Sequence, residues 1–194
     1  MHHGISLKRS EKTAKVPIGN SGLKSSHGGE EIHSKHKRAI LRKYPHLAHA
    51  GVAARKAEMR SNKRMSSEIR TMNLHTLHKV AHNLHTKFEE MTPKQKEEHL
   101  RKHVLGANHT PMERAGHHHH RHITHVKKSG IEHHIEHPAT QHDHILKDIK
   151  NVNSSHSGTS VNFYHKGKKF AAHRFKFTSQ SDPLSSIKGS LERR

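Results

Sequence analysis

Cysteine and tryptophan are absent from the sequence, and aromatic residues make up only 4% of its 194 positions. The absence of cysteine excludes disulfides, thiolate zinc sites and cysteine nucleophiles. Hydrophobic residues amount to 29%, whereas a typical globular domain reaches roughly 45–50% when glycine is counted. We therefore expect no large autonomous core, and we expect the chain to be completed by a partner.

Long apolar runs and enzyme motifs are missing as well. No run approaches the roughly 20 apolar residues of a membrane-spanning helix, and residues 1–16 lack the apolar segment of a secretory signal. The sequence contains no GxxxxGK phosphate loop, no GxSxG motif and no Rossmann glycine pattern. We expect a protein that is not an enzyme, has no catalytic residue, and is located inside the cell or within a virion or ribonucleoprotein particle.

Positive charge is the dominant property of the chain, which has 36 Lys and Arg, 16 Asp and Glu, and a formal net charge of +20. The excess is concentrated at the two ends. Residues 1–64 hold 15 basic and 4 acidic residues, and residues 155–194 hold 8 and 2. Such a charge repels itself in an isolated compact chain and attracts polyanions. We expect the partner to be nucleic acid, acidic protein subunits of a larger particle, or both.

The most regular pattern lies in residues 65–91. Its apolar residues are separated alternately by three and four positions, which predicts one face of a helix that packs against another helix. A row of histidines runs beside this face. The apolar positions are Leu74, Leu77, Ala81, Leu84, Phe88 and Met91, and the histidines are His75, His78, His82 and His85. The same stripe is suited to self-association of two copies.

Shorter elements are predicted on both sides of this helix from proline, glycine and capping residues. The expected helices cover residues 30–44, 45–59, 92–106 and 110–128, a segment from Pro138, and a final short segment from Asp182-Pro183. Residues 153–160 are expected to form a linker. Alternating residues 161–165 and 170–178 on either side of Gly167 predict a β-hairpin.

Together these patterns predict a mainly α protein, with several short helices around one longer amphipathic helix, a C-terminal β-hairpin and extended basic tails, and without an autonomous compact domain. Two strands alone are marginally stable, so the hairpin is expected to lie on another surface. The expected divisions are an extended basic arm (1–29), a helical region (30–106), a His-rich helical or linker region (107–154), and a basic β-hairpin with the C-terminal tail (155–194).

Two basic clusters are candidates for contact with phosphates. The first lies in the two predicted helices, 30–44 and 45–59, and in the residues that follow them up to residue 64. The second lies in the predicted hairpin, whose aromatic residues suit either packing or stacking on bases. The candidate residues are Lys35, Lys37, Arg38, Arg42, Lys43, Arg55, Lys56, Arg60, Lys63, Arg64, Lys166, Lys168, Lys169, Arg174 and Lys176. Because the helical cluster has only Tyr44 as an aromatic residue, we expect sequence-independent binding.

Histidine is unusually frequent, with 28 in all and 11 between His117 and His144. Neutral imidazole is a common ligand of zinc and nickel, and two histidines four residues apart on a helix can share one ion. The candidate metal ligands are His78, His82, His99 and His103. The other interpretation is a polar surface with no cofactor, which gains charge near pH 6 and then binds a polyanion more tightly.

These observations favour a non-enzymatic basic structural protein of a large nucleoprotein assembly, such as a virion or a ribosome-like particle. It is expected to contact nucleic-acid phosphates, acidic partner proteins or both, without reading base sequence. One alternative is a histidine-rich metal-binding protein centred on residues 117–144. A second alternative is an assembly subunit that binds an acidic protein partner only.

Overall fold

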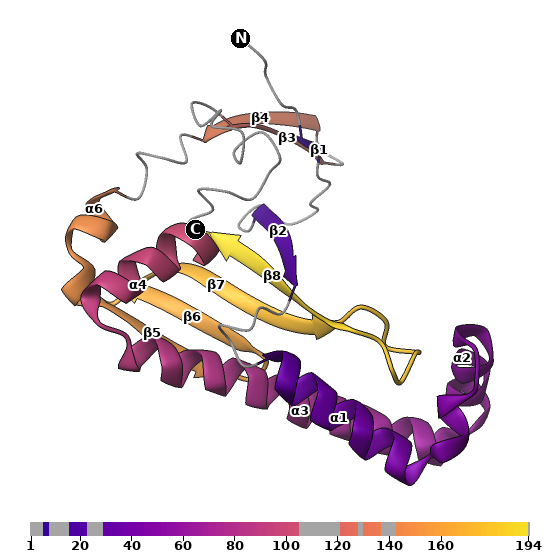
Figure 1. Ribbon diagram of the computed structural model, residues 1–194. Helices are drawn as coiled ribbons and strands as arrows, with labels where there is room; N and C mark the ends of the chain where they lie inside the picture. Colours follow the sequence, from indigo (N-terminus) through magenta and orange to yellow (C-terminus); the bar gives the residue numbers. More distant parts are fainter. Residues whose placement is uncertain are drawn as a thin grey trace.

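A five-stranded antiparallel sheet crossed by one long helix is the main feature of the structure (Figure 1). The structure is a computed structural model that describes residues 6–7, 16–22, 29–104, 121–127, 130–136 and 143–193. A second, three-stranded sheet consists of β1 (Ser6–Leu7), β3 (Arg121–Lys127) and β4 (Gly130–Glu136). Within these ranges, no helix has the length and apolar character needed to cross a membrane.

Most of the helices precede the sheet in sequence. They are α1 (Gly29–Lys43), the 3-10 helix η2 (Pro45–Ala48), α2 (Val52–Ser61), α3 (Lys63–Glu90), α4 (Pro93–His99) and the π-helical η3 (Leu100–Val104). The cap of α3 is Asn62, whose side chain accepts a hydrogen bond from the Met65 backbone N–H at 3.0 Å. The predicted helix start at Thr92 is confirmed, because Thr92 and Gln95 form a capping box at the beginning of α4.

The sheet follows the strand order β2–β8–β7–β6–β5. Its strands are β2 (Val16–Gly22), β5 (Val152–Ser157), β6 (Ser160–His165), β7 (Lys168–Phe177) and β8 (Ile187–Arg193). Lys166 and Gly167 join β6 to β7, and both have positive φ (49° and 77°), as a type I′ turn requires. Two short elements, α6 (Asp143–Lys147) and η4 (Ile149–Asn151), lead into β5.

The predicted C-terminal β-hairpin is wrong, whereas the predicted mainly α character is roughly consistent with the structure. Strands β6 and β7 do pair, but they are inner strands of a larger sheet in which β8 pairs with both β7 and β2. The expected linker at 153–160 forms most of β5 and the turn to β6. Asp182-Pro183 begins a turn that leads into β8 rather than a helix, and residues 121–127 form β3 rather than a helix.

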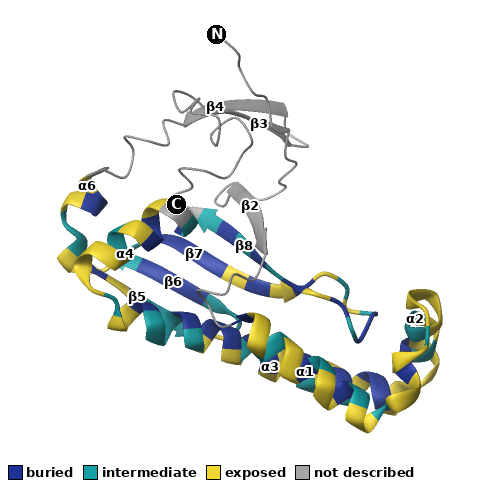
Figure 2. Ribbon diagram, in the orientation of Figure 1, coloured by how far each residue is buried: buried dark blue, intermediate teal, exposed yellow. Residues whose placement is uncertain are grey.

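The apolar core is divided between the two halves of α3 (Figure 2). The second half packs on one face of the sheet, where the ring of Phe88 lies 5.1 Å from that of Phe163. The first half packs with α1, η2 and α2 in a smaller cluster of Ile40, Leu47, Met59, Met65 and Ile69. The sheet supplies the apolar layer that composition alone did not predict, so the described chain buries a core of its own.

The buried face of α3 changes direction along the helix. Leu74, a predicted packing residue, has 52% of its surface exposed, whereas Asn73 and Thr76 beside it are buried. The predicted residues Leu77, Ala81, Leu84 and Phe88 are buried. The shift occurs because α3 packs first against α1 and then against the sheet, so the face turned to the interior differs between its two halves.

A buried histidine lies where α1 meets α3. His36 is 6% exposed, its Nδ1 atom lies 2.9 Å from the Thr76 hydroxyl, and its ring centroid lies 5.2 Å from that of Phe177. Burial lowers the pKa of His36 to about 4, although a hydrogen bond with Asn73 favours the charged form. The imidazole is therefore neutral in the native protein over the physiological pH range.

We expect acid to destabilise the fold through His36. The native state takes up this proton only near pH 4, whereas the unfolded chain takes it up near pH 6.5, so the free energy of unfolding falls as the pH drops from about 6.5 to about 4. Between pH 7.5 and pH 5 the loss is about 2 kcal/mol.

Urea unfolding across this range should show a shallower pH dependence for His36→Asn than for the wild type. His75→Asn, at an exposed position, should leave the dependence unchanged, and equal pH dependence in wild type and His36→Asn would exclude His36 as the cause.

Candidate nucleic-acid interface

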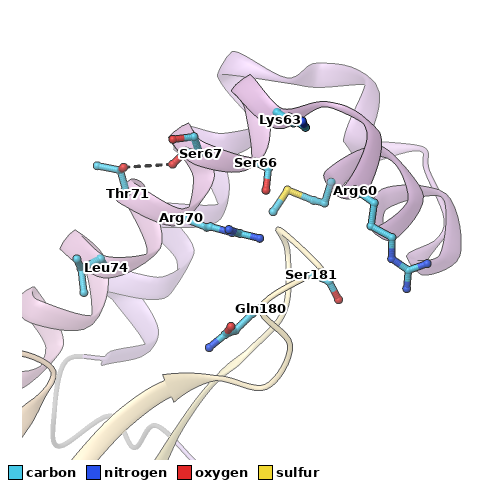
Figure 3. Close-up of a pocket in the computed structure, with 10 residues that line it drawn as sticks. Arg60, Lys63, Ser66, Ser67, Arg70, Thr71, Leu74, Gln180 and Ser181 are labelled. Atoms are coloured by element: carbon cyan, nitrogen blue, oxygen red, sulfur yellow. Dashed lines mark hydrogen bonds between the residues drawn. The ribbon is translucent and has the colours of Figure 1, made fainter.

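A groove opens between the end of α2, the first half of α3 and the loop that joins β7 to β8 (Figure 3). It has a volume of about 750 Å³. The residues that line it are Met59, Arg60, Lys63, Ser66, Ser67, Arg70, Thr71, Leu74, Gln180 and Ser181. Three of them are cationic, four carry hydroxyl groups, and none of them is acidic or a histidine. The lining therefore offers hydrogen-bond donors and positive charge but no general base.

One side of the groove is a single stripe of α3. Lys63, Ser67, Arg70 and Leu74 follow one another at spacings of three or four residues, so they project from the same side of the helix. A neighbouring stripe that includes Ile69 is buried in the cluster shared with α1 and α2. The packing of that buried stripe fixes the direction in which the polar stripe points.

Arg70 extends from α3 across the groove. In Figure 3 its side chain extends from α3 toward the loop between β7 and β8, which carries Gln180 and Ser181. The Thr71 hydroxyl donates to the Ser67 carbonyl at 3.2 Å. The guanidinium group thus lies between two walls that both present polar side chains.

The groove cations are not neutralised by the part of the chain that the structure describes. Arg60, Lys63 and Arg70 are exposed, and no described carboxylate lies within 4 Å of their charged atoms. Guanidinium, ammonium and hydroxyl groups are the side chains that hydrogen-bond phosphate oxygens. The arrangement is therefore suited to binding phosphate groups.

A largely buried ion pair holds the loop in place. Arg55 of α2 donates from Nε to Oδ1 of Asp182 at 2.8 Å and from Nη2 to Oδ2 at 3.3 Å, and the two side chains are 14% and 10% exposed. Nη1 of Arg55 donates to the Ala50 carbonyl at 2.6 Å. Burial disfavours the charged carboxylate, but hydrogen bonds from Arg55 and from the Leu184 backbone outweigh it and hold the pKa of Asp182 below its ordinary value. This pair positions the neighbouring Ser181 at the groove.

Several of the predicted phosphate-binding residues have partners within the chain. The pairs are Lys35 with Glu31 (2.6 Å), Lys43 with Glu68 (2.6 Å), Arg64 with Glu68 (3.5 Å), Lys166 with Asp148 (2.9 Å), Arg174 with Glu192 (3.9 Å), Arg55 with Asp182, and Lys169 with the Asn162 side chain. Exposed ion pairs are weak and exchange readily with a ligand. Arg55 differs because its partner is buried, so it is held by the fold.

The remaining predicted residues lack such partners in the described ranges. No described carboxylate lies within 4 Å of Lys37, Arg38, Arg42, Lys56, Arg60, Lys63, Lys168 or Lys176. Of all the predicted residues, the structure brings only Arg60 and Lys63 to the groove. Sequence reasoning does not single out Arg70, although its place seven residues after Lys63 puts it on the same side of the helix. Gln180 has no signal in the sequence, because the fold alone brings it to the groove.

Burial decides between the two roles expected for the aromatic residues of the hairpin, packing in the core and stacking on bases. Phe163, Phe170, Phe175 and Phe177 are all buried in the core beneath α3. They are therefore packing residues. Tyr164 is half-buried and is the aromatic residue of this segment that keeps exposed surface.

The four predicted metal ligands lie in two places. On α3, His78 and His82 face His156 of β5, with ring centroids 6.2 Å and 5.6 Å from that of His156. His99 is 5% exposed and its ring lies 5.1 Å from that of His103. Among the residues described, no group of three or more His, Asp or Glu side chains is arranged to hold a metal ion. Most of the histidines between 117 and 144 lie outside the described side chains.

The groove is thus the site that the geometry of the described residues favours. It combines an all-cationic charged lining, hydroxyl donors and an opening to solvent, and the loop on one side is held by an ion pair. No family model matches the chain, and comparisons with curated proteins and with solved structures find no similar protein or fold.

Proposed function

We propose that the protein is a non-enzymatic, basic structural component of a large nucleoprotein assembly. In this proposal it resides within the particle and binds nucleic-acid phosphates through the groove. The observation that carries the proposal is the lining of the groove, in which Arg60, Lys63 and Arg70 are accompanied by hydroxyl groups and by no acidic residue. The net charge of +20 supports the same class of partner.

Binding through this groove is independent of base sequence. Sequence is read by contacts to base edges, whereas contacts to phosphates position the nucleic acid without selecting bases. The lining residues hydrogen-bond phosphate oxygens, and no aromatic residue is among them. In this proposal the protein therefore binds nucleic acid through charge and shape and does not read base sequence.

Neutralising the groove should weaken nucleic-acid binding and its salt dependence. We expect Lys63→Gln/Arg70→Gln to bind a mixed-sequence oligonucleotide about tenfold more weakly near 0.1 M salt, and to lower the slope of log K against log salt by roughly 1.4–1.8. Fluorescence anisotropy over a range of salt concentrations measures both quantities.

The matched control is Lys79→Gln/Lys94→Gln, which removes the same charge from exposed lysines without a described carboxylate within 4 Å. This variant should bind nearly as the wild type does. An equal loss in both variants would assign the effect to net charge, and no loss in the groove variant would exclude the groove.

The assembly itself requires a separate test on material from the native source. Gradient sedimentation at low and high salt should show the protein with a large particle that contains nucleic acid, and salt should release it. Sedimentation as a small free protein would contradict the proposal. Release from a particle that contains no nucleic acid would favour the alternative of an acidic protein partner.

Histidine-rich metal binding is the second candidate function. His78 and His82 lie near His156, but no three described side chains are arranged to hold an ion, so further ligands would have to come from the histidines between residues 117 and 144. Metal binding through imidazole is insensitive to salt and is lost as the histidines take up protons. A fixed metal content after dialysis near pH 8, and its loss near pH 5, would support this function.

A further inference from the structure

The two faces of the five-stranded sheet have opposite character. Phe163, Phe175 and Leu191 lie on the inner face, in the core cluster shared with α3. Because side chains alternate along a strand, the neighbouring positions point to the outer face. Among these outer positions are Ser155, Ser160, Arg174, Lys176, Lys188 and Glu192, together with Asn162 and Ala172, which are buried. Along β7 and β8 the exposed part of the outer face is therefore polar, with three cations and one carboxylate.

Two lysines on this outer face lie directly opposite each other. In the antiparallel register of β7 and β8, Lys176 pairs with Lys188. Directly opposed side chains have Cβ atoms about 5 Å apart, and like charges in this position are destabilising. No carboxylate of the described chain lies within 4 Å of either ammonium group. The fold thus holds two like charges together without a counter-charge from the described residues.

A third cation extends this pair along β7. Arg174 is two residues before Lys176, about 6.8 Å away along the strand on the same face. Its partner across the ladder is Ser190, and the nearest carboxylate, that of Glu192, is 3.9 Å from Nη1. The three cations form a short row whose spacing is comparable with that of neighbouring phosphates in an extended strand.

The rest of the outer face suits an unpaired strand better than a duplex. Tyr164 lies on the same face, four residues along β6 from Ser160, the residue that pairs with Arg174. That separation is about 13 Å, a few nucleotides of an extended strand. Stacking on an aromatic ring requires an unpaired base, and a duplex hides its bases.

We propose that the outer face of β7 and β8 binds the backbone of single-stranded nucleic acid. Lys176 and Lys188 share one phosphate, Arg174 contacts a neighbouring phosphate, and Tyr164 stacks on a base further along. This inference rests on the proposed function, since it names a second contact surface for the same class of partner. The groove and the outer face have no residue in common, so the charges of each can be removed while those of the other are kept.

The test uses the full chain and three variants with equal loss of charge. They are Lys176→Gln/Lys188→Gln on the outer face, Lys63→Gln/Arg70→Gln in the groove, and the control Lys79→Gln/Lys94→Gln. The probe is oligo(dT), compared with a duplex of the same length by fluorescence anisotropy over a range of salt. We expect the outer-face variant to bind oligo(dT) about tenfold more weakly and to lower the salt slope by roughly 1.4, with a smaller effect on the duplex.

Thermal unfolding separates this role from a structural one. Because the two lysines repel each other, the melting temperature of Lys176→Gln/Lys188→Gln should equal or exceed that of the wild type. A lower melting temperature accompanied by weaker binding would overturn the proposal, since the lysines would then support the fold. An equal loss of affinity in the control, or an equal effect on the duplex, would overturn it as well.

The outcomes distinguish this inference from the proposed function. If the groove variant weakens binding and the outer-face variant does not, the groove binds nucleic acid and the outer face does not. If the wild type binds neither probe, the proposed function fails together with the inference. If polyglutamate displaces oligo(dT) as well as unlabelled oligo(dT) does, the surface recognises acidic chains in general, and the single-strand assignment is overturned.

Discussion

Replacing Arg55 with alanine is expected to destabilise the protein by about 3 kcal/mol. The substitution leaves the Asp182 carboxylate, which is 10% exposed, without the two hydrogen bonds that Arg55 donates to it. An uncompensated charge in a buried position is costly, and it is the removal of one partner rather than of both that creates it. Urea unfolding at pH 7 measures the loss.

Two further variants test whether the loss of stability in Arg55→Ala comes from the unpaired Asp182 carboxylate. Arg60→Ala, at an exposed position on the same helix, should change the free energy of unfolding by no more than about 0.5 kcal/mol. The double variant Arg55→Ala/Asp182→Ala should be more stable than the sum of the two single losses predicts, since it leaves no unpaired carboxylate. Strict additivity would mean that the pair does not act as a unit.

Gly189→Ala is expected to destabilise the protein by a similar amount, about 3 kcal/mol. A Cβ atom at position 189 would lie 2.1 Å from Nε2 of His173. The imidazole is 1% exposed and its ring lies 4.6 Å from the ring of Phe175, so it has little space to move. Thermal and urea unfolding both report this loss.

Gly51→Ala provides the matched control, because a Cβ atom there meets nothing within 4 Å. Its stability should stay within about 0.5 kcal/mol of the wild type. In a His173→Ala background the cost of Gly189→Ala should shrink, because the colliding ring is gone. An unchanged cost in that background would show that the backbone of β8, and not His173, rejects a side chain at this position.

The sequence predicts those elements of the fold that depend on the spacing of residues within one short segment. The spacing of Leu77, Ala81, Leu84 and Phe88 indicates a helix, and α3 is present at Lys63–Glu90. The capping box at Thr92 also depends only on residues that are adjacent in sequence. Local periodicity and capping are properties of a short segment, so no knowledge of the rest of the chain is needed.

The sheet is harder to predict because its strands are polar on one face and depend on remote partners. Ser154 of β5 has the composition of a linker, yet its backbone N–H and hydroxyl both donate to Glu89 of α3, at 2.6 Å and 2.7 Å. Asp182 resembles a helix cap, but its carboxylate pairs with Arg55. Each of these partners is distant in sequence, so composition assigns the segment incorrectly.

The candidate site also contains residues that local sequence predicts and residues that only the fold brings together. Arg60 and Lys63 follow from the density of basic residues, whereas Arg70 is not predicted, although the helical period places it on the same side as Lys63. Gln180 and Ser181 reach the groove only because the loop between β7 and β8 folds back onto α2 and α3. The opposition of Lys176 and Lys188 likewise depends on the register of two strands.

The place of β8 in the sheet has a consequence for biosynthesis. β8 follows every other described strand in sequence, yet it pairs with both β2 and β7. While the ribosome is still making residues 187–193, β2 has no neighbour in the sheet, and β7, whose phenylalanines face the core, has an edge of unpaired backbone groups. Open strand edges of this kind pair with other chains. β8 thus takes the place between β2 and β7 and pairs both of their open edges. A nascent chain released before β8 is synthesised would be prone to aggregation.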